Sequence, residues 1–261
     1  MKRFARVIVA LACVWIAVLF VLGFVLSGST GDKVAKRFGE SVQGAATIGD
    51  SSLGLVLGSF SAEKLSVRRD DVIGKLSIDV DEVSCDLAPL GIALVDRSCG
   101  DLEIKGVKLE LSTIAIFKMP RPKRKPFEAE RVVIENADLA FSPSAFLPSL
   151  GHVKIRIEHA EAGPTTFKSP LSFLFNLQTL RAQIELPAGI TLRLDYANGK
   201  LTAAGSLFGS TPVELPLVLP KIESTDDAKA ELEKLVVFGK DLAKQLVAQK
   251  AQDLLQKLPL P

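Results

Sequence analysis

The feature that most constrains this chain is an uninterrupted apolar run near its N-terminus. No charged residue occurs from Val7 to Ser27. As a helix rising ~1.5 Å per residue, the run is close in length to the ~30 Å hydrocarbon core of a bilayer. A cleaved signal peptide shares the basic start provided by Lys2, Arg3 and Arg6, but its apolar region usually has only ~7 to 15 residues. The sequence therefore favours an uncleaved transmembrane helix over a signal peptide.

The orientation of this helix is predicted from its short basic tail, which indicates a cytoplasmic N-terminus. Lys33, Lys36 and Arg37 follow the run, so the positive-inside count alone does not decide. Long domains translocate largely regardless of charge. The only cysteines outside the run, Cys85 and Cys99, could form a disulfide in an oxidising compartment, with two free buried thiols as the alternative. We expect the bulk of the chain to be exported.

Apolar and polar side chains alternate through most of the remaining chain, with the period of a β-strand. Leu76, Ile78 and Val80 alternate with polar residues, which is typical of an antiparallel sheet with one wet face. Asn198-Gly199 is the strongest hairpin signal. Further alternating segments are 102–111, 131–141, 153–157, 180–186, 190–196 and 200–207.

The alternation changes phase at two places. Leu102 and Ile104 give way to Val107 and Leu109 across Gly106, which predicts a β-bulge that bends the strand. A second change of phase falls near Asn136. Between these segments, 118–127 contains three prolines that forbid regular structure. Its four basic residues are candidates for contact with anionic lipid headgroups, although a solvated loop is the simpler reading: Arg121, Lys123, Arg124 and Lys125.

After Pro220 the period becomes helical. Leu232, Leu235, Leu242 and Leu246 lie three, four or seven residues apart on one stripe. The stripe could pack against the sheet, a membrane surface or a partner helix. The predicted fold is thus mainly β, with a transmembrane helix, an antiparallel twisted sheet forming a groove or open barrel, and a long C-terminal amphipathic helix. The predicted divisions are a cytoplasmic tail (1–6), the transmembrane helix (7–27), a linker with a short helix (28–45), a β-rich domain (46–220) and the amphipathic helix (224–258).

No catalytic pattern stands out in the sequence. The two histidines, His152 and His159, have no cysteine or carboxylate cluster at ligand spacing. Phosphate-binding loops and nucleophile motifs are also absent from the sequence. A net charge of +2 gives no sign of nucleic-acid binding. We therefore expect a non-enzymatic protein without a cofactor or a bound metal.

The order of these features resembles the N-terminal region of the AsmA-like family, which includes the TamB proteins. The segments that carry the resemblance are GAATIGDSSLGLVLGSFSAEKLSV (44–67), DLEIKGVKLEL (101–111), FEAERVVIENADLAF (127–141) and, more loosely, DYANGKLTAAGSLFG (195–209). The resemblance implies a single-pass protein of the bacterial inner membrane, with its bulk in the periplasm, that serves envelope biogenesis. It also implies a β-groove for phospholipid, possible envelope protein partners and no chemical reaction.

The residues expected to line such a groove lie on two alternating segments: Leu102, Ile104, Val107, Leu109, Leu111, Val132 and Ile134. A closed sandwich is the alternative arrangement. About ten strands spaced ~4.8 Å apart extend only ~50 Å, so a lipid conduit across the periplasm would need partners or self-assembly. The N component of type II secretion systems is similar in size and layout, which makes a secretion scaffold the alternative function.

Overall fold

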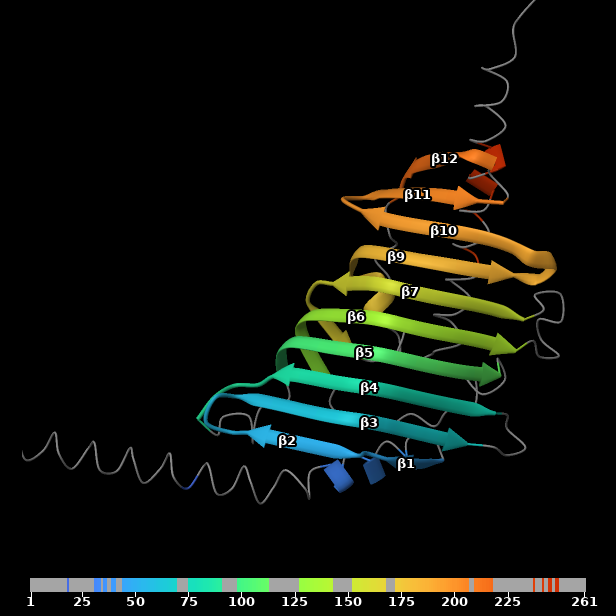
Figure 1. Cartoon of the computed structure of the whole chain (residues 1–261). Coiled ribbons are helices and arrows are strands. Elements are labelled where there is room, and N and C mark those ends of the chain that lie inside the picture. Colours follow the sequence, from blue (N-terminus) through green and yellow to red (C-terminus); the bar gives the residue numbers. More distant parts are fainter. Residues whose placement is uncertain are drawn as a thin grey trace, which may run out of the picture.

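The computed structural model shows one large β-sheet (Figure 1). The residues that the structure describes are 18, 31–33, 35–36, 39–40, 44–69, 75–90, 98–112, 127–142, 152–167, 172–206, 209–217, 237, 241, 244–245 and 247–248. Its elements are β1 (Ala45–Thr47), β2 (Asp50–Gly54), β3 (Ser59–Arg69), β4 (Leu76–Asp86), β5 (Ser98–Ser112), β6 (Phe127–Ser142), β7 (Val153–Ala162), β8 (Thr165–Phe167), α3 (Ser172–Phe175), β9 (Leu177–Leu186), a 3-10 turn (Pro187–Gly189), β10 (Ile190–Ala197), β11 (Lys200–Gly205) and β12 (Gly209–Pro216).

The strands follow one another across the sheet almost in chain order. The path runs β1-β3-β4-β5-β6-β7-β9-β10-β11-β12, with β2 beside β3 and β8 beside β6. Neither end of this path pairs with the other, so the described strands form an open sheet and not a closed barrel. The prediction of a mainly β, open fold is confirmed.

The predicted antiparallel pairing is wrong at one place, because β5 and β6 pair in parallel. Leu102 lies beside Val132 and Leu109 beside Leu139, with both strands running in the same direction. Parallel neighbours cannot be joined by a tight turn and need a crossover of about a dozen residues or more. Residues 113–126, including Arg121, Lys123, Arg124 and Lys125, make this connection and lie outside the described residues.

A line of left-handed residues crosses the middle of the sheet. Lys64 on β3, Gly106 on β5 and Asn136 on β6 have φ of 54°, 66° and 55°. Each lies where the register leaves one cross-strand pair open, with Asp81 of β4 between the first two. We call this line the crease. The apolar alternation changes phase at the crease, so apolar side chains stay on one face from end to end of each strand.

The predicted β-bulge at Gly106 is wrong. The register of β5 with β4 is the same on both sides of Gly106, so no extra residue is inserted there. A single left-handed residue shifts the phase instead, and glycine adopts that conformation without steric cost. A Cβ at Gly106 would also collide with the Asp81 carboxylate. True register shifts occur further across the described sheet, between β7 and β9 near Glu158 and Glu161 and between β11 and β12 after Ala203.

The two edges of the sheet differ. β1 and β2 are two pieces of one edge strand along β3, separated at Ile48 and Gly49. At the other edge, the Leu217 N–H donates to the Gly199 carbonyl at 2.8 Å. In an antiparallel pair every second residue is hydrogen-bonded to the neighbouring strand, so the residue two positions before Leu217 also directs its backbone groups toward β11. Pro216 therefore faces outward, and Pro212 lies within the register irregularity of β12. Proline has no N–H, so β12 is a poor template for another strand.

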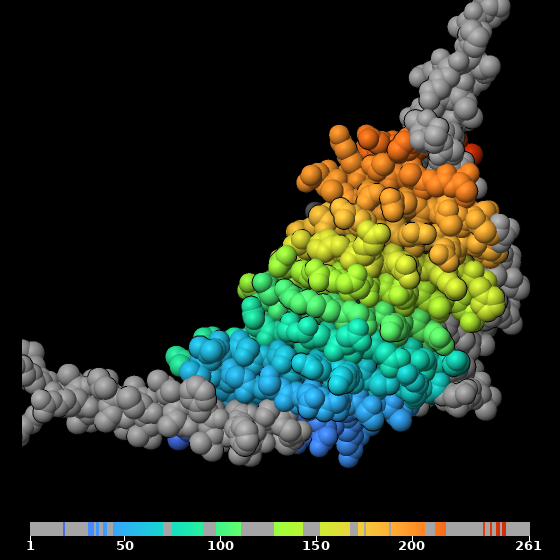
Figure 2. All heavy atoms as spheres, viewed as in Figure 1, coloured from blue at the N-terminus to red at the C-terminus, as the bar shows by residue number. Residues whose placement is uncertain are grey.

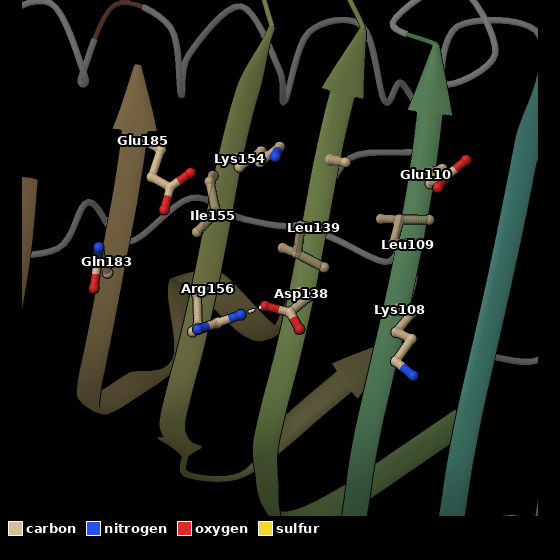
Figure 3. A pocket seen from close by; sticks show the side chains of 11 residues that line it. Lys108, Leu109, Glu110, Asp138, Leu139, Lys154, Ile155, Arg156, Gln183 and Glu185 are labelled. Atoms are coloured by element: carbon tan, nitrogen blue, oxygen red, sulfur yellow. Dashed lines mark hydrogen bonds and ion pairs between the residues drawn. The ribbon is translucent and has the colours of Figure 1, made fainter. Parts of the chain in front are cut away.

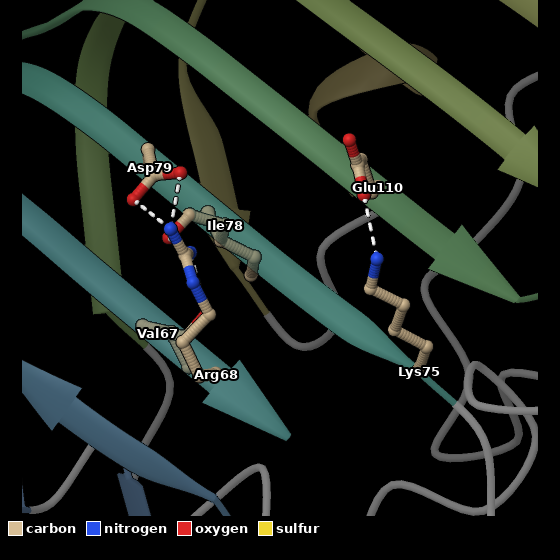
Figure 4. Close-up of polar contacts among 6 residues, drawn as sticks. All are labelled: Val67, Arg68, Lys75, Ile78, Asp79 and Glu110. Carbon is tan, nitrogen blue, oxygen red and sulfur yellow. Dashed lines mark hydrogen bonds and ion pairs between the residues drawn. The ribbon is translucent and has the colours of Figure 1, made fainter. Parts of the chain in front are cut away.

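The outer face of the sheet is polar and carries ion pairs between neighbouring strands. Figure 2 shows this face as continuous bands of side chains from β2 to β12. Both Asp79 carboxylate oxygens accept hydrogen bonds of 2.7 Å from Arg68 Nη2, and Lys75 Nζ lies 3.1 Å from Glu110 Oε2 (Figure 4). The Arg68 hydrogen bond lowers the pKa of Asp79. Each such exposed pair contributes only about 0 to 1 kcal/mol.

The transmembrane and C-terminal helices were predicted in regions that the structure largely leaves undescribed. Residues 7–27 lie outside the described residues except for Val18, which is helical. Within the described part of the chain, no helix has the length and apolar character needed to cross a bilayer. Of 224–258, only residues 237, 241, 244–245 and 247–248 are described, and they are helical.

Candidate functional site

The inner face of the sheet is the candidate functional site, because it carries apolar side chains in register over most strands. Alternation along each strand places Val67, Ile78, Leu109, Leu139 and Ile155 on this face, opposite the ion pairs. The seven residues predicted to line a groove belong to β5 and β6 in the middle of it. The structure thus brings these two strands side by side, which the sequence could only suppose.

Register organises the inner face into rows that run across the strands, among them a deep, a middle and a half-buried row. The deep row lies nearest the Cys85–Cys99 disulfide and consists of Phe60, Cys85, Leu102, Val132, Ala162 and Leu177. The middle row consists of Ala62, Val83, Ile104, Ile134, Ala160, Leu180, Tyr196, Leu201 and Leu215. The half-buried row lies beyond the crease and consists of Ala46, Val67, Ile78, Leu109, Leu139, Ile155, Ile184 and Leu192.

The deep row is a well-packed core. Val132 is 1% exposed and Ala162 is fully buried. Phe173 of the short helix α3 belongs to the same buried cluster. The Cys85–Cys99 disulfide, with Cα atoms 5.7 Å apart, ties the end of β4 to the start of β5 beside this row. Of the two states that the sequence left open for these cysteines, the structure has the disulfide.

The half-buried row is covered much less. Only Val67 in it is fully buried, whereas Leu109, Leu139, Ile155, Ile184 and the remaining members are partly exposed. Among the described elements, strands contact mainly their neighbours in the sheet, and α3 packs near β8 at the other end. At the β1 end of this row, the helical residues Gly31, Ala35 and Gly39 are buried, and a Cβ at Gly39 would lie 3.6 Å from the Ala46 Cβ. The eight members of the row span seven strand spacings of ~4.8 Å, or roughly 34 Å.

The predicted groove residues divide between these environments. Leu102 and Val132 are buried in the deep row, and Ile104 and Ile134 are half-buried in the middle row. Val107 and Leu109 lie beyond the crease and are also half-buried. Leu111 lies opposite Phe141 in the register, but its side chain lies outside the described residues.

Sequence reasoning missed most of the half-buried row. Ile78, Ile155, Ile184 and Leu192 all lay in segments with recognised alternation. Which of them become neighbours depends on the register between strands that are far apart in the sequence. The alternation therefore identified the apolar side chains but not the row that they form.

A shallow hollow of about 380 Å³ lies on the outer face behind the half-buried row (Figure 3). Its polar rim has three cations and three carboxylates, so it has no net charge. Arg156 Nε donates to Asp138 Oδ1 at 2.8 Å, and this carboxylate raises the pKa of Arg156. The charged residues of the rim are Lys108, Glu110, Asp138, Lys154, Arg156 and Glu185.

The described part of the chain contains no cluster of side chains suited to catalysis. No group of three or more histidine, cysteine, aspartate or glutamate side chains converges there to hold a metal ion. His159 lies on the outer face with its Nε2 4.0 Å from Glu161 Oε2. Glu161 instead accepts a 2.6 Å hydrogen bond from Arg131 Nε, and this contact raises the pKa of Arg131.

No protein-family model matches the chain, and no curated protein matches its sequence.

Proposed function

We propose that this chain is a membrane-anchored, non-enzymatic protein of the bacterial envelope that holds phospholipid acyl chains against the inner face of its sheet. The observation that carries the proposal is the half-buried row, in which the in-register aliphatic side chains from Ile78 to Leu192 are partly exposed. The sequence resemblance to AsmA-like proteins supports the same function. The anchor is the predicted helix at 7–27, which leaves the sheet in the periplasm.

Removing apolar surface from water is worth about 25 cal/mol per Å², and large contiguous apolar patches on soluble proteins usually mark binding sites. Lipid acyl chains can cover such a row without needing hydrogen-bond partners. One leaflet contributes about half of the ~30 Å hydrocarbon core, so a row of roughly 34 Å has room for one or two acyl chains end to end.

Two predicted segments complete the proposal. The amphipathic stripe of 224–258 would act as a lid over the inner face when lipid is absent. The basic residues Arg121, Lys123, Arg124 and Lys125 would contact the phosphate headgroup. Both segments are placed here by their sequence alone.

The proposal is tested by photo-crosslinking in cells grown with labelled phosphate. A photoreactive phenylalanine derivative replaces Leu139 on the half-buried row, and a matched control replaces Ala140, its neighbour on the outer face. We expect labelled phospholipid adducts from position 139 and few from position 140. Equal labelling at the two positions would remove the basis for lipid binding.

The same experiment separates lipid binding from the alternative scaffold function. A scaffold of a secretion system would give a discrete protein adduct at position 139 in place of lipid. Lipid extraction from the purified full-length chain provides an independent readout, since phospholipid should co-purify with the protein in a constant molar ratio. Protein prepared from several hosts without any lipid would argue for the scaffold.

A further inference from the structure

Two turns at the disulfide end of the sheet form a single uncharged tip. The first, Leu55 to Gly58, joins β2 to β3, and the second, Leu87 to Leu90, follows β4. Their backbones are hydrogen-bonded to each other: the Leu87 N–H donates to the Gly58 carbonyl at 2.9 Å and the Leu90 N–H to the Val56 carbonyl at 3.4 Å. All side chains in both turns are apolar. We call these residues the apolar tip.

Each turn has one leucine directed into the protein and one directed outward. Leu55 is 2% exposed, and Leu87 packs against the cluster that contains the deep row. Leu57 is 84% exposed and Leu90 is 50% exposed. These two are the most exposed large apolar side chains among the described residues from 44 to 217. The inner leucines hold the turns in place, so the outer leucines are presented on a fixed support.

The backbone of the tip carries a feature that stability alone does not explain. Leu90 has a φ of 58°, a left-handed conformation that large side chains rarely adopt and that glycine or asparagine occupies more favourably. At Gly58, by contrast, a Cβ would collide with the Leu87 carbonyl oxygen, so glycine is required there. A leucine that is both exposed and conformationally strained indicates a function for its side chain.

We propose that the apolar tip inserts into the surface of the bilayer that holds the predicted anchor. The inference rests on the membrane attachment in the proposed function. The tip belongs to the first hairpin after the predicted span, since β2 and β3 are the first long strands of the chain. Ser59 and Asp86, the polar residues that flank the turns, limit insertion to the boundary between headgroups and acyl chains, ~5 to 10 Å deep.

A bilayer fits this surface better than a protein partner. The side chains of the two turns carry no donor, acceptor or charge, which are the groups that give a protein interface its orientation and specificity. Phe60 and Cys85 of the deep row directly follow and precede the two turns. Insertion of the tip would therefore place the deep row, and not the half-buried row, nearest the membrane.

The test uses tryptophan fluorescence of the full chain in vesicles of phosphatidylcholine and phosphatidylglycerol with brominated acyl chains. Trp15 is the only native tryptophan, so Trp15→Phe is the background for Leu57→Trp and for Leu90→Trp. The control is Lys200→Trp, at an exposed position at the start of β11 near the opposite edge. We expect blue-shifted emission and several-fold stronger quenching at positions 57 and 90 than at position 200. Vesicle flotation verifies that every variant is anchored.

Two results would overturn the insertion. One is quenching at positions 57 and 90 that equals quenching at position 200. The other is a blue shift without quenching, which would mean that protein and not lipid covers the tip. Both are distinguishable from failure of the proposed function, because photo-crosslinking at Leu139 reports lipid on the inner face whether or not the tip touches the bilayer.

Discussion

The two ends of the inner face are built from similar side chains but differ in burial. The deep row, beside the disulfide, is enclosed by the curl of the sheet, visible where β5 and β6 begin in Figure 1, and by α3. The half-buried row, beyond the crease, is aliphatic and partly exposed over most of its length, although Val67 in it packs with the buried Leu76. The difference indicates that the deep row contributes more to stability than the half-buried row does.

The largest expected effect is on the free energy of unfolding when a charge is introduced into the deep row or into the half-buried row. Val132→Asp places a carboxylate at a position that is 1% exposed, and we expect a loss of at least about 4 kcal/mol. Leu139→Asp on the same strand should cost only about 1 kcal/mol, because its side chain is half-buried. Urea unfolding of the detergent-solubilised chain measures both. Similar losses for the two variants would mean that the rows do not differ.

Removal of the disulfide should weaken the deep end selectively. The double variant Cys85→Ser/Cys99→Ser loses a cross-link between residues 14 apart, for which we expect about 2 to 4 kcal/mol. Hydrogen exchange should rise at the end of β4 and the start of β5, with little change beyond the crease. Reducing agent applied to the wild-type chain is the control and should reproduce the effect. A uniform rise over all strands would show that the two ends unfold together.

A substitution at the crease tests whether the left-handed conformation of Gly106 is required for stability. Gly106→Ala introduces a side chain at positive φ and into the Asp81 carboxylate, so we expect about 1 to 3 kcal/mol of destabilisation. Gly100→Ala on the same strand is the matched control, since its Cβ would meet only ordinary contacts at 3.6 Å or more. Equal unfolding free energies for the two variants would contradict the role of the crease.

The smallest expected effect belongs to the outer face. Asp79→Asn removes the ion pair with Arg68, and we expect a loss of about 0.3 to 1 kcal/mol at neutral pH. The pKa of Asp79 is lowered in the folded chain from its ordinary value of 3.8. Its contribution is therefore present above that value and disappears as the pH falls through the lowered pKa. Urea unfolding of both proteins as a function of pH should show the curves converge under acid conditions.

Much of the strand content could be predicted from the sequence because alternation is a local signal. Asn198 and Gly199 adopt the positive φ values of 51° and 72° that their hairpin requires. The phase changes at Gly106 and Asn136 are also visible in the sequence, although the bulge predicted at Gly106 is wrong. The strands β1, β2 and β8 were not predicted because each has only three to five residues, and β12 was not predicted because Pro212 and Pro216 interrupt it.

The candidate site was harder to predict, because it depends on which strands become neighbours. Leu109 and Leu139 are separated by a segment with three prolines, and the parallel pairing that joins them is not encoded in either strand alone. Ile184 and Leu192 reach the same row through pairings further along the chain. The outward leucines of the apolar tip had no periodic signal, and only their exposure and backbone conformation reveal them.

The prolines of β12 make one edge of the sheet a poor partner for another strand. A second polypeptide that approaches this side finds missing hydrogen-bond donors at Pro212 and Pro216, whereas the side formed by β1 and β2 contains no proline. Addition of a further strand is therefore disfavoured on the β12 side of the sheet.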